Sequence, residues 1–393
     1  MINYNVKTYG RNKEIRDLYK MFAADRDVTM PGPRRLGKTF MLGRLVDESA
    51  ANGWTAVKAE LAGCSDSGSV FRELCGKIGG ARAGGAQAIA FITQRLMQFV
   101  APRTEFTGPW YQPFIGVDHE SYFERLIQTL HEDKGRRWVL LIDELPIFLK
   151  ALHDKGPAGV ASARDFMNNL NRLRTNYPRV RWMITGSIGI EPLAKVGSYM
   201  GALAKFAPFK LEPLSSDQAK DYIQDRARAG GFLHRQEITD AEAQALIDAT
   251  GWLAPFYLDA LTARLDGPLQ SNPVQAKLAV DAAISDLMNE CGPITFGTWE
   301  EHLSKHYKPA DRALALKALG ALAHHPNGMD LGGVLASVDR VDLSTDELRQ
   351  VLMQLCSDGF IIVDSWGNPE PRCRFLNPLL RLWWLQARPH FSS

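Results

Sequence analysis

The sequence has little of what marks a secreted, zinc-stabilised or membrane protein. Its five cysteines are scattered over 393 residues, with no C-x-x-C pair and no histidine at ligand spacing from any of them. This pattern argues against structural zinc and against a disulfide scaffold. The N-terminus lacks a basic stretch followed by an apolar one, and no apolar run approaches the ~18 residues that a membrane span needs. We therefore expect a cytoplasmic protein with no membrane segment.

The chain also lacks an excess of charge of either sign. Its 46 basic and 44 acidic side chains give no general attraction to nucleic acid or to an anionic membrane, so any DNA contact is expected to be local. A pair of histidines, His302 and His306, is four residues apart, but the segment HLSKH lacks the glutamate of H-E-x-x-H. No third ligand is visible, and we expect ordinary surface histidines rather than a metal site.

A phosphate-binding pattern is present near the N-terminus. The segment GPRRLGKT at 32–39 matches G-x-x-x-x-G-K-[ST], whose backbone N–H groups cradle phosphates. A short strand at 27–30 precedes it, and apolar residues at helical spacing continue to a helix stop at 52–53. The predicted nucleotide-binding residues are Gly32, Pro33, Arg34, Arg35, Leu36, Gly37, Lys38, Thr39 and Phe40.

A second segment, RRWVLLIDELPIFL, supplies acidic groups for the same chemistry. The apolar run 138–142 predicts a central parallel strand, and Asp143 follows at the end where ligands bind in such sheets. Asp143 is therefore predicted to hold magnesium together with Thr39, and Glu144 to act as the general base on water. The alternative is that both acids only cap a helix beginning at 145–146.

A third apolar run, at 180–184, predicts another buried strand. It is followed by Thr185, Gly186 and Ser187. A hydroxyl at this sheet edge is expected to reach the terminal phosphate or its attacking water. The alternative is a plain Gly-Ser turn after a strand.

Two segments point to contacts with other molecules. The segment 79–118 is not needed by the sheet, and its aromatic residues are predicted either to contact a partner or to fold back onto their own domain. These residues are Phe106, Trp110, Tyr111 and Phe114. Residues 309–393 have winged-helix order, but the surface of the predicted third helix carries one basic and two acidic residues. This favours a protein-contact or lid-control role over sequence-specific DNA binding, although Arg372 and Arg374 of the wing are placed to touch backbone phosphate.

Several segments together resemble a known family. YGRNKEIRDL from Tyr9, GPRRLGKT, the D-E strand, the T-G-S strand and RFLNPLLRLWW from Arg374 are similar to the archaeal-ATPase family, among the AAA+ and STAND relatives. The resemblance implies an α/β fold: a P-loop NTPase core with a central parallel sheet at 1–213, with the insert at 79–118. It also implies a helical lid at 214–308 and a winged-helix domain at 309–393.

The resemblance also implies roles for single residues, with ATP and magnesium as cofactors. Lys38 and Thr39 of Walker A would hold phosphate and magnesium, Asp143 and Glu144 of Walker B would hold magnesium and activate water, and Thr185 or Ser187 would sense the phosphate. Gly10 and Arg11 would lie near the adenine, and Pro255 would contact the base.

The chain departs from the family pattern at two places. The segment 251–255 is longer than the usual Gly-x-Pro, and no arginine follows the sensing hydroxyl directly. An arginine finger would have to come from elsewhere, and Arg172, Arg174 and Arg179 are candidates by position only.

These observations give two main functional hypotheses. The first is an ATP-hydrolysing conformational switch that acts through self-assembly or a protein partner. The second is a DNA-binding ATPase of origin-recognition or transposition-regulator type. A nucleotide-binding scaffold without turnover is a third, and the presence of both Lys38 and Glu144 argues against it.

Overall fold

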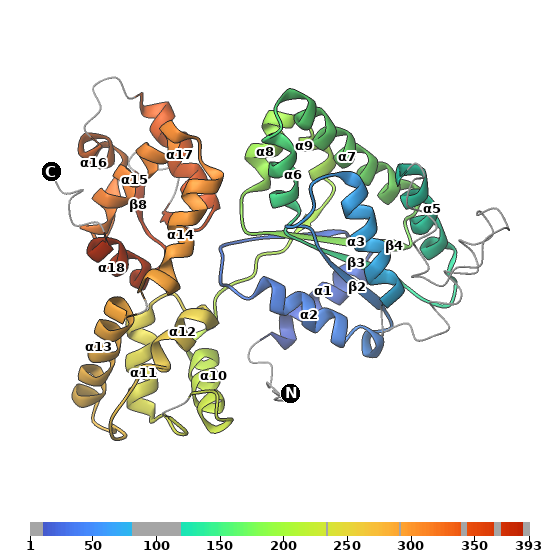
Figure 1. Ribbon diagram of the computed structural model, residues 1–393. Helices are drawn as coiled ribbons and strands as arrows, with labels where there is room; N and C mark the ends of the chain where they lie inside the picture. The colour runs from blue at the N-terminus through green and yellow to red at the C-terminus, as the bar shows by residue number, and fades with distance from the viewer. Residues whose placement is uncertain are drawn as a thin grey trace. The chain divides into compact units, whose positions relative to one another are not determined.

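The computed structural model describes residues 11–80, 119–232, 235–290, 292–338, 344–364 and 371–387. The chain divides into two compact units (Figure 1). The first holds Arg11–Gly32 and Lys38–Leu211, and the second holds Pro33–Gly37 and the described residues from Glu212 onward. The expected boundaries at 213 and 308 within this organisation stay predictions.

The first unit is built on a five-stranded parallel sheet. Its strands are β1 (Val28–Pro31), β2 (Thr55–Glu60), β3 (Trp138–Asp143), β4 (Val180–Gly186) and β5 (Ala207–Pro208). Their order is β2-β3-β4-β1-β5, so β4 lies between the strand that leads into the loop and the strand that ends in Asp143. Every residue of β3 and β4 is buried, as their continuous apolar runs predict.

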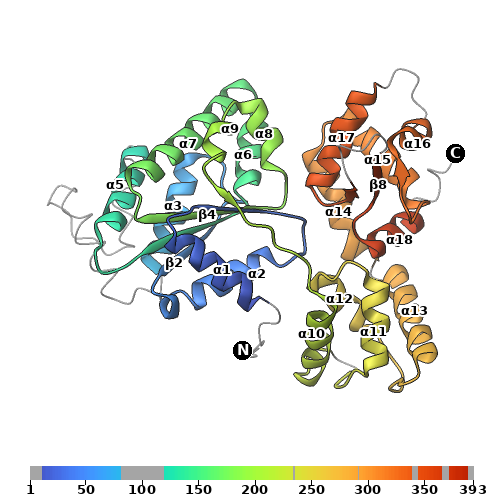
Figure 2. The same cartoon turned by 180° about the vertical axis from the view of Figure 1, so that it is seen from behind.

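Helices cover both faces of this sheet (Figures 1 and 2). On one face lie α1 (Asn12–Ala23) and α2 (Lys38–Asp47). On the other lie α3 (Ser67–Gly80), α5 (His119–Glu132), α6 (Leu145–His153), α7 (Pro157–Asn176), α8 (Ile190–Gly197) and α9 (Met200–Leu203). The arrangement is the layered α/β fold that the sequence predicts.

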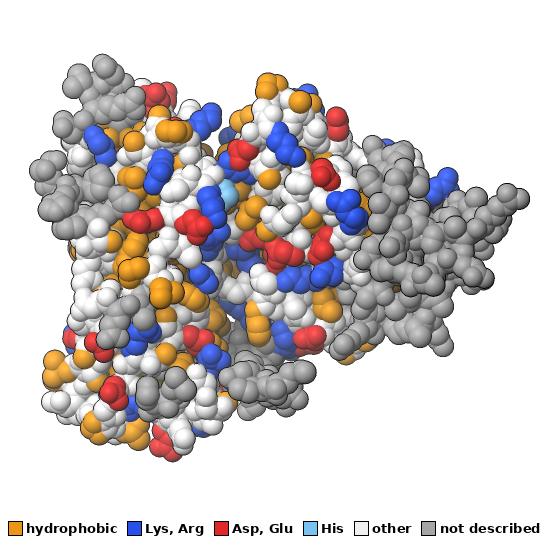
Figure 3. All heavy atoms as spheres, viewed as in Figure 1, with side chains coloured by type: hydrophobic (Ala, Val, Ile, Leu, Met, Phe, Trp, Pro, Cys, Tyr) orange, Lys and Arg blue, Asp and Glu red, His pale blue; other side chains and the backbone are white. Residues whose placement is uncertain are grey.

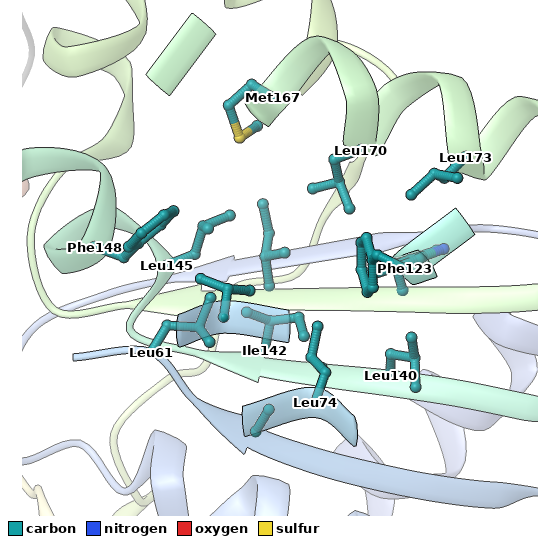
Figure 4. Packing of buried hydrophobic residues seen from close by; sticks show 14 of the residues in the cluster. Leu61, Leu74, Phe123, Leu140, Ile142, Leu145, Phe148, Met167, Leu170 and Leu173 are labelled. Carbon is teal, nitrogen blue, oxygen red and sulfur yellow. The ribbon is translucent and has the colours of Figure 1, made fainter. Parts of the chain in front are cut away.

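A hydrophobic core layer lies between the sheet and the second group of helices (Figure 4). Alternate residues of β3, such as Leu140 and Ile142, face this layer and pack with Leu74 of α3 and Phe123 of α5. Each such fully buried side chain stabilises the fold by roughly 1.5–3 kcal/mol. The layer therefore fixes the sheet edge at which β3 ends.

The helix after the phosphate loop is shorter than expected. α2 ends at Asp47, and a separate 3₁₀ helix, η1 (Ala50–Asn52), follows. The Ser49 hydroxyl donates to Val46 O at 2.7 Å and the Asn52 amide donates to Glu48 O at 2.9 Å. Such side-chain bonds to backbone carbonyls compete with helix propagation, which the apolar spacing alone did not reveal.

The second unit is helical in its first part. It contains α10 (Ser216–Arg228), α11 (Asp240–Thr250), α12 (Pro255–Thr262), α13 (Pro273–Glu290) and α14 (Gly292–His306). Two of these helices begin with a capping box. Ser215 forms a capping box with Gln218, and Thr239 forms one with Glu242.

The remainder of this unit has the predicted winged-helix order. α15 (Pro309–Ala323), α16 (Leu331–Ser337) and α17 (Thr345–Ser357) are followed by a hairpin, and α18 (Pro378–Ala387) comes last. The hairpin strand β8 (Arg372–Phe375) pairs on one side with β7 (Ile361–Val363) and on the other with β6 (Met329–Asp330), in the antiparallel order β6-β8-β7. On α17 the buried residues are Leu348, Val351, Leu352 and Leu355.

The expectation that His302 lies on the surface is wrong. His302 is 1% exposed, and its Nε2 lies 3.2 Å from Asp358 Oδ2. It is three residues after the buried Trp299, and this spacing places it on the core face of α14. Over the described residues, no group of three or more His, Cys, Asp or Glu side chains is placed to hold a metal ion.

Some predictions fall outside the described residues. They concern Gly10, nearly all of the insert 79–118 with its four aromatic residues, and the wing turn at 367–369. Among the described helices, none combines the length and the apolar composition needed to cross a membrane.

Candidate functional site

Three strand ends bring the predicted polar residues together. β1, β3 and β4 are parallel neighbours, so their carboxyl ends meet at one edge of the sheet. Asp143 at the end of β3 is completely buried. Its Oδ2 accepts a hydrogen bond from Thr39 Oγ1 at 2.9 Å, and its Oδ1 accepts one from Thr185 Oγ1 at 2.5 Å. The loop, the acidic strand and the T-G-S strand thus share one carboxylate.

A lysine that the sequence analysis did not single out completes this group. Lys58 on β2 places Nζ 3.3 Å from Asp143 Oδ2, and its side chain is 25% exposed. A buried carboxylate needs such a partner, because an unpaired buried charge is strongly destabilising. The sequence does contain a sign of this role. In the segment TAVKAE, charged residues stand at the end of a strand whose other residues are buried.

A second acid, Glu60, ends the same strand. The pKa of its carboxyl is raised, first by partial burial and then by repulsion from Asp143 and Glu144, while Lys58 opposes the shift. Glu60 stands opposite Asp143 in the β2–β3 register. The site therefore gathers three acidic side chains at adjacent strand ends.

The raised pKa of Glu60 predicts a pH-dependent stability. Folding favours the protonated form, so the ionised form destabilises the native state once pH rises through the folded-state pKa. Glu60→Gln removes this cost. We expect the variant to have a higher melting temperature than the wild type at about pH 7 and the same one at about pH 4, where Glu60 is largely protonated in both states. A variant that is no more stable at neutral pH would contradict the assignment.

Glu144 lies one residue beyond β3 in a left-handed backbone conformation, with φ of 57°. Its Oε2 accepts hydrogen bonds from both the backbone N–H and the hydroxyl of Ser187, each at 2.9 Å. Glu144 occupies the N-cap position of α6, but its side chain makes no capping bond. Glu144 therefore does not act as a helix cap through its side chain, because its carboxylate contacts Ser187 instead.

Gly186 allows this approach between β4 and α6. A Cβ at this position would lie 2.4 Å from Cγ of Pro146, closer than real contacts allow. Pro146 stands in the first turn of α6, directly after the residues that carry the acids. The glycine of T-G-S is therefore a packing requirement of the site rather than a feature of a loose turn.

Gly186→Ala is expected to lower the free energy of unfolding by about 1–3 kcal/mol, the usual cost of overpacking. Urea denaturation measures this change. Gly76→Ala is the matched control, because a Cβ there meets nothing within 4 Å and the residue lies inside α3. The control should be neutral or more stable by about 0.5–1 kcal/mol. Equal effects at the two glycines would show that the approach to Pro146 is not tight.

The loop itself has the conformation that a phosphate cradle needs. Gly37 has φ of 95° and Arg35 has φ of 69°. Left-handed residues in such a turn let successive backbone N–H groups converge on one concavity that binds an anion. Leu36 is 2% exposed and anchors the loop. Lys38 is 6% exposed, and its Nζ donates to Gly32 O at 2.6 Å across the loop.

The other predicted nucleotide-binding residues take different positions. Arg34 donates to Thr298 O at 3.4 Å, and the guanidinium carbon of Arg35 lies 4.1 Å from the ring centroid of Phe256. Pro255 begins α12, next to Phe256, and all of these residues belong to the second unit. The predicted contacts of Pro255 and Arg11 with a base stay predictions.

The remaining residues with predicted nucleotide contacts differ in their exposure to solvent and in the unit to which they belong. Phe40 is 48% exposed at the start of α2, and Pro33 belongs to the second unit. Arg11 is buried and forms an ion pair with Glu14 at 3.1 Å.

The three candidates for an arginine finger do not lie at the edge of the sheet that carries the site. Arg172 forms a bidentate pair with Glu124 at 2.7 and 2.8 Å. Arg174 is buried and contacts Asp27 at 2.7 Å, next to the start of β1, and Arg179 precedes the start of β4. Since the site is at the other ends of these strands, Arg174 and Arg179 cannot reach it within the unit.

The donor set fits magnesium. Magnesium takes oxygen ligands and keeps several of its waters, so few protein ligands are needed. The Thr39 hydroxyl and the fully buried Asp143 carboxylate lie within hydrogen-bond distance at the end of the phosphate loop and offer two such oxygens.

The strand order, the loop and the acids at and directly after the end of β3 define a P-loop NTPase fold. Comparison with solved structures agrees. The Walker-type ATPase PABY2304 of Pyrococcus abyssi matches with a TM-score of 0.66 at 13% identity, over 96% of each chain. The ORC2 protein of Aeropyrum pernix, solved with ADPNP and ADP, matches with a TM-score of 0.55 at 13% identity, over 99% of this chain and 97% of that one.

At these identities the likeness is one of fold. The expected resemblance to archaeal P-loop ATPases is confirmed at that level, including the C-terminal winged helix. Comparison of the sequence with family models and with curated proteins gave no match.

Proposed function

We propose that this protein binds ATP with magnesium and hydrolyses it at the edge formed by β1, β3 and β4. The observation that carries the proposal is the pair of contacts made by adjacent acids. Asp143 is joined to Thr39 of the loop, while Glu144 is joined to Ser187 of the neighbouring strand. A hydrolytic site needs both a metal-holding acid and a separate, positioned base.

The residues would divide the reaction as follows. Lys38 and the loop N–H groups hold the phosphates, and Thr39 with Asp143 holds magnesium, which supplies neutralising charge when bound. Glu144 accepts a proton from the water whose oxygen attacks the terminal phosphorus. The bond to the leaving oxygen of ADP breaks, and ADP and phosphate are the products. Ser187 orients the Glu144 carboxylate through its hydrogen bonds. Thr185 donates a hydrogen bond to Asp143 and would sense a change at the terminal phosphate through this contact.

The hydrolysis is proposed to drive a conformational switch through self-assembly or a protein partner. Only a difference between the ATP and ADP affinities of two states can drive such a cycle. A ligand at ~1,000 times its dissociation constant stabilises the competent state by roughly 4 kcal/mol, which is enough to shift a poised equilibrium. The similar ORC2 protein was solved with both ADPNP and ADP.

The charge on the winged helix supports a protein-directed role over DNA binding. The exposed face of α17 carries Asp346 and Glu347 beside Arg349. Phosphate contacts normally need several lysines or arginines on one surface. Figure 3 shows acidic and basic side chains interspersed over the visible described surface, without an extended basic field.

The proposed hydrolysis is tested by phosphate release from ATP with magnesium and with excess chelator. We expect Asp143→Asn to lower the rate by about 100-fold or more, the effect typical of removing one preorganised charged group. Asp17→Asn is the matched control, because Asp17 lies on α1 and pairs with Lys20. Turnover that needs no magnesium, or that survives in Asp143→Asn, would contradict the proposed site.

A further inference from the structure

A cavity of about 340 Å³ opens in the first unit, away from the site described above. Its walls include Phe22, Asp25, Trp54, Arg137, Arg179 and Arg181. We propose that this cavity binds a small organic phosphate monoester, whose phosphate is held by the three arginines and whose carbon part lies against the aromatic wall.

The cavity lies at the ends of the strands opposite to the candidate ATPase site. Trp54 directly precedes β2, Arg137 directly precedes β3, and Arg181 is the second residue of β4. Strand β3 has six residues, and at ~3.3 Å per residue the two sheet edges are about 20 Å apart. A ligand here is therefore separate from one held by Lys38 and Asp143.

Arg181 is the buried anchor of this site. It is 4% exposed, and its Nε is buried without a hydrogen-bond partner among the described residues. Its two Nη atoms donate to Asp25 O and Pro178 O. A buried guanidinium N–H without a partner is costly. Arg181 lines the cavity, and a small movement of its side chain toward the cavity would give this N–H an anionic acceptor.

The charge of Arg181 is only partly neutralised. Asp27 contacts Arg174 at 2.7 Å and lies 3.9 Å from Arg181, so one carboxylate serves two guanidinium groups. The cavity wall itself carries three arginines and a single acid, Asp25. The excess of about two positive charges matches a phosphate monoester dianion better than a carboxylate monoanion.

The two outer arginines keep donors available. The Arg137 guanidinium lies 5.7 Å from the centroid of the Trp54 ring, and its N–H groups have no hydrogen-bond partner among the described residues. Arg179 donates from Nη2 to Asp133 O at 3.0 Å, which engages only part of its planar fork. Both residues are exposed. Arg137 and Arg179 are thus placed to bind an anion from the solvent side of the cavity, while Arg181 binds it from the buried side.

The apolar wall and the size of the cavity select an organic phosphate over a free ion. Phe22 and Trp54 are at least nine-tenths buried and give the cavity an aromatic side. The volume is within the range of about 300–1,000 Å³ found for small-molecule sites, and is larger than one phosphate group requires.

The test uses phenyl phosphate as the probe and the full chain carrying Lys38→Ala, so that the phosphate loop does not compete. Binding is measured by ³¹P line broadening and by calorimetry. We expect Arg137→Ala with Arg179→Ala to weaken phenyl phosphate binding at least tenfold. Arg16→Ala, which removes an exposed arginine of α1 from outside the cavity, should leave it unchanged.

Two further probes test the ligand class. Benzoate keeps the ring but carries one charge, and inorganic phosphate keeps the anion but lacks the ring. Both should bind at least tenfold more weakly than phenyl phosphate. Absence of phenyl phosphate binding, or binding that the double variant does not change, would overturn the site. Equal binding of benzoate would overturn the phosphate assignment, and equal binding of inorganic phosphate would overturn the role of the aromatic wall.

Discussion

Glu144→Gln is expected to bind ATP with the affinity of the wild type and to hydrolyse it about 100-fold or more slowly. A general base contributes roughly 10²–10⁴ to a rate, and glutamine cannot accept the proton of the attacking water. The side chain keeps its size, and its amide oxygen can still accept the hydrogen bonds that Ser187 donates. Binding and turnover are measured separately, by nucleotide titration and by single-turnover phosphate release.

The matched control is Glu60→Gln. Glu60 is an acid at the neighbouring strand end, close enough to Glu144 to repel it. Its turnover should stay within about threefold of the wild type. If Glu60→Gln abolished hydrolysis while Glu144→Gln retained it, the base would be Glu60, and the assignment based on the position after β3 would be wrong.

Lys38→Ala is expected to weaken ATP binding by about 100-fold or more, which corresponds to roughly 2.7 kcal/mol. Lys38 is the buried cation of the loop, and its Nζ donates a hydrogen bond to Gly32 O across the loop. A charged hydrogen bond to phosphate in such a setting is stronger than a neutral one. The variant loses the bond to Gly32 O but keeps the buried strands that carry the site, so it should still fold.

The readout is the rise in melting temperature that saturating ATP with magnesium produces. The wild type should gain stability, and Lys38→Ala should gain little at the same concentration. Lys77→Ala on α3 removes an exposed lysine and should behave as the wild type does. An equal ATP-induced rise in Lys38→Ala and the wild type would show that the loop does not hold the phosphates.

The parts of the fold that the sequence predicted are those with strong local patterns. The apolar runs at 138–142 and 180–184 lie in buried strands as expected, and local capping boxes at Thr239 and Ser344 open two helices. In each of these cases the residues that decide the structure lie within a few positions of one another.

The parts that were missed depend on partners distant in the chain. Lys58 meets Asp143 because β2 pairs with β3, and the sequence does not reveal which strands are neighbours. Arg174 meets Asp27 from 147 positions away, and His302 is buried against Asp358 of another helix end. A solvated arginine or histidine and a buried, paired one look alike until the tertiary partner is known.

The measurement that tests the proposed switch most directly is the solution mass of the Glu144→Gln protein in ATP with magnesium and in ADP, each with and without a short duplex at moderate salt. The account predicts a larger assembly in ATP than in ADP, independent of the duplex. The same mass in both nucleotides, or a gain in mass only when the duplex is present, would contradict it.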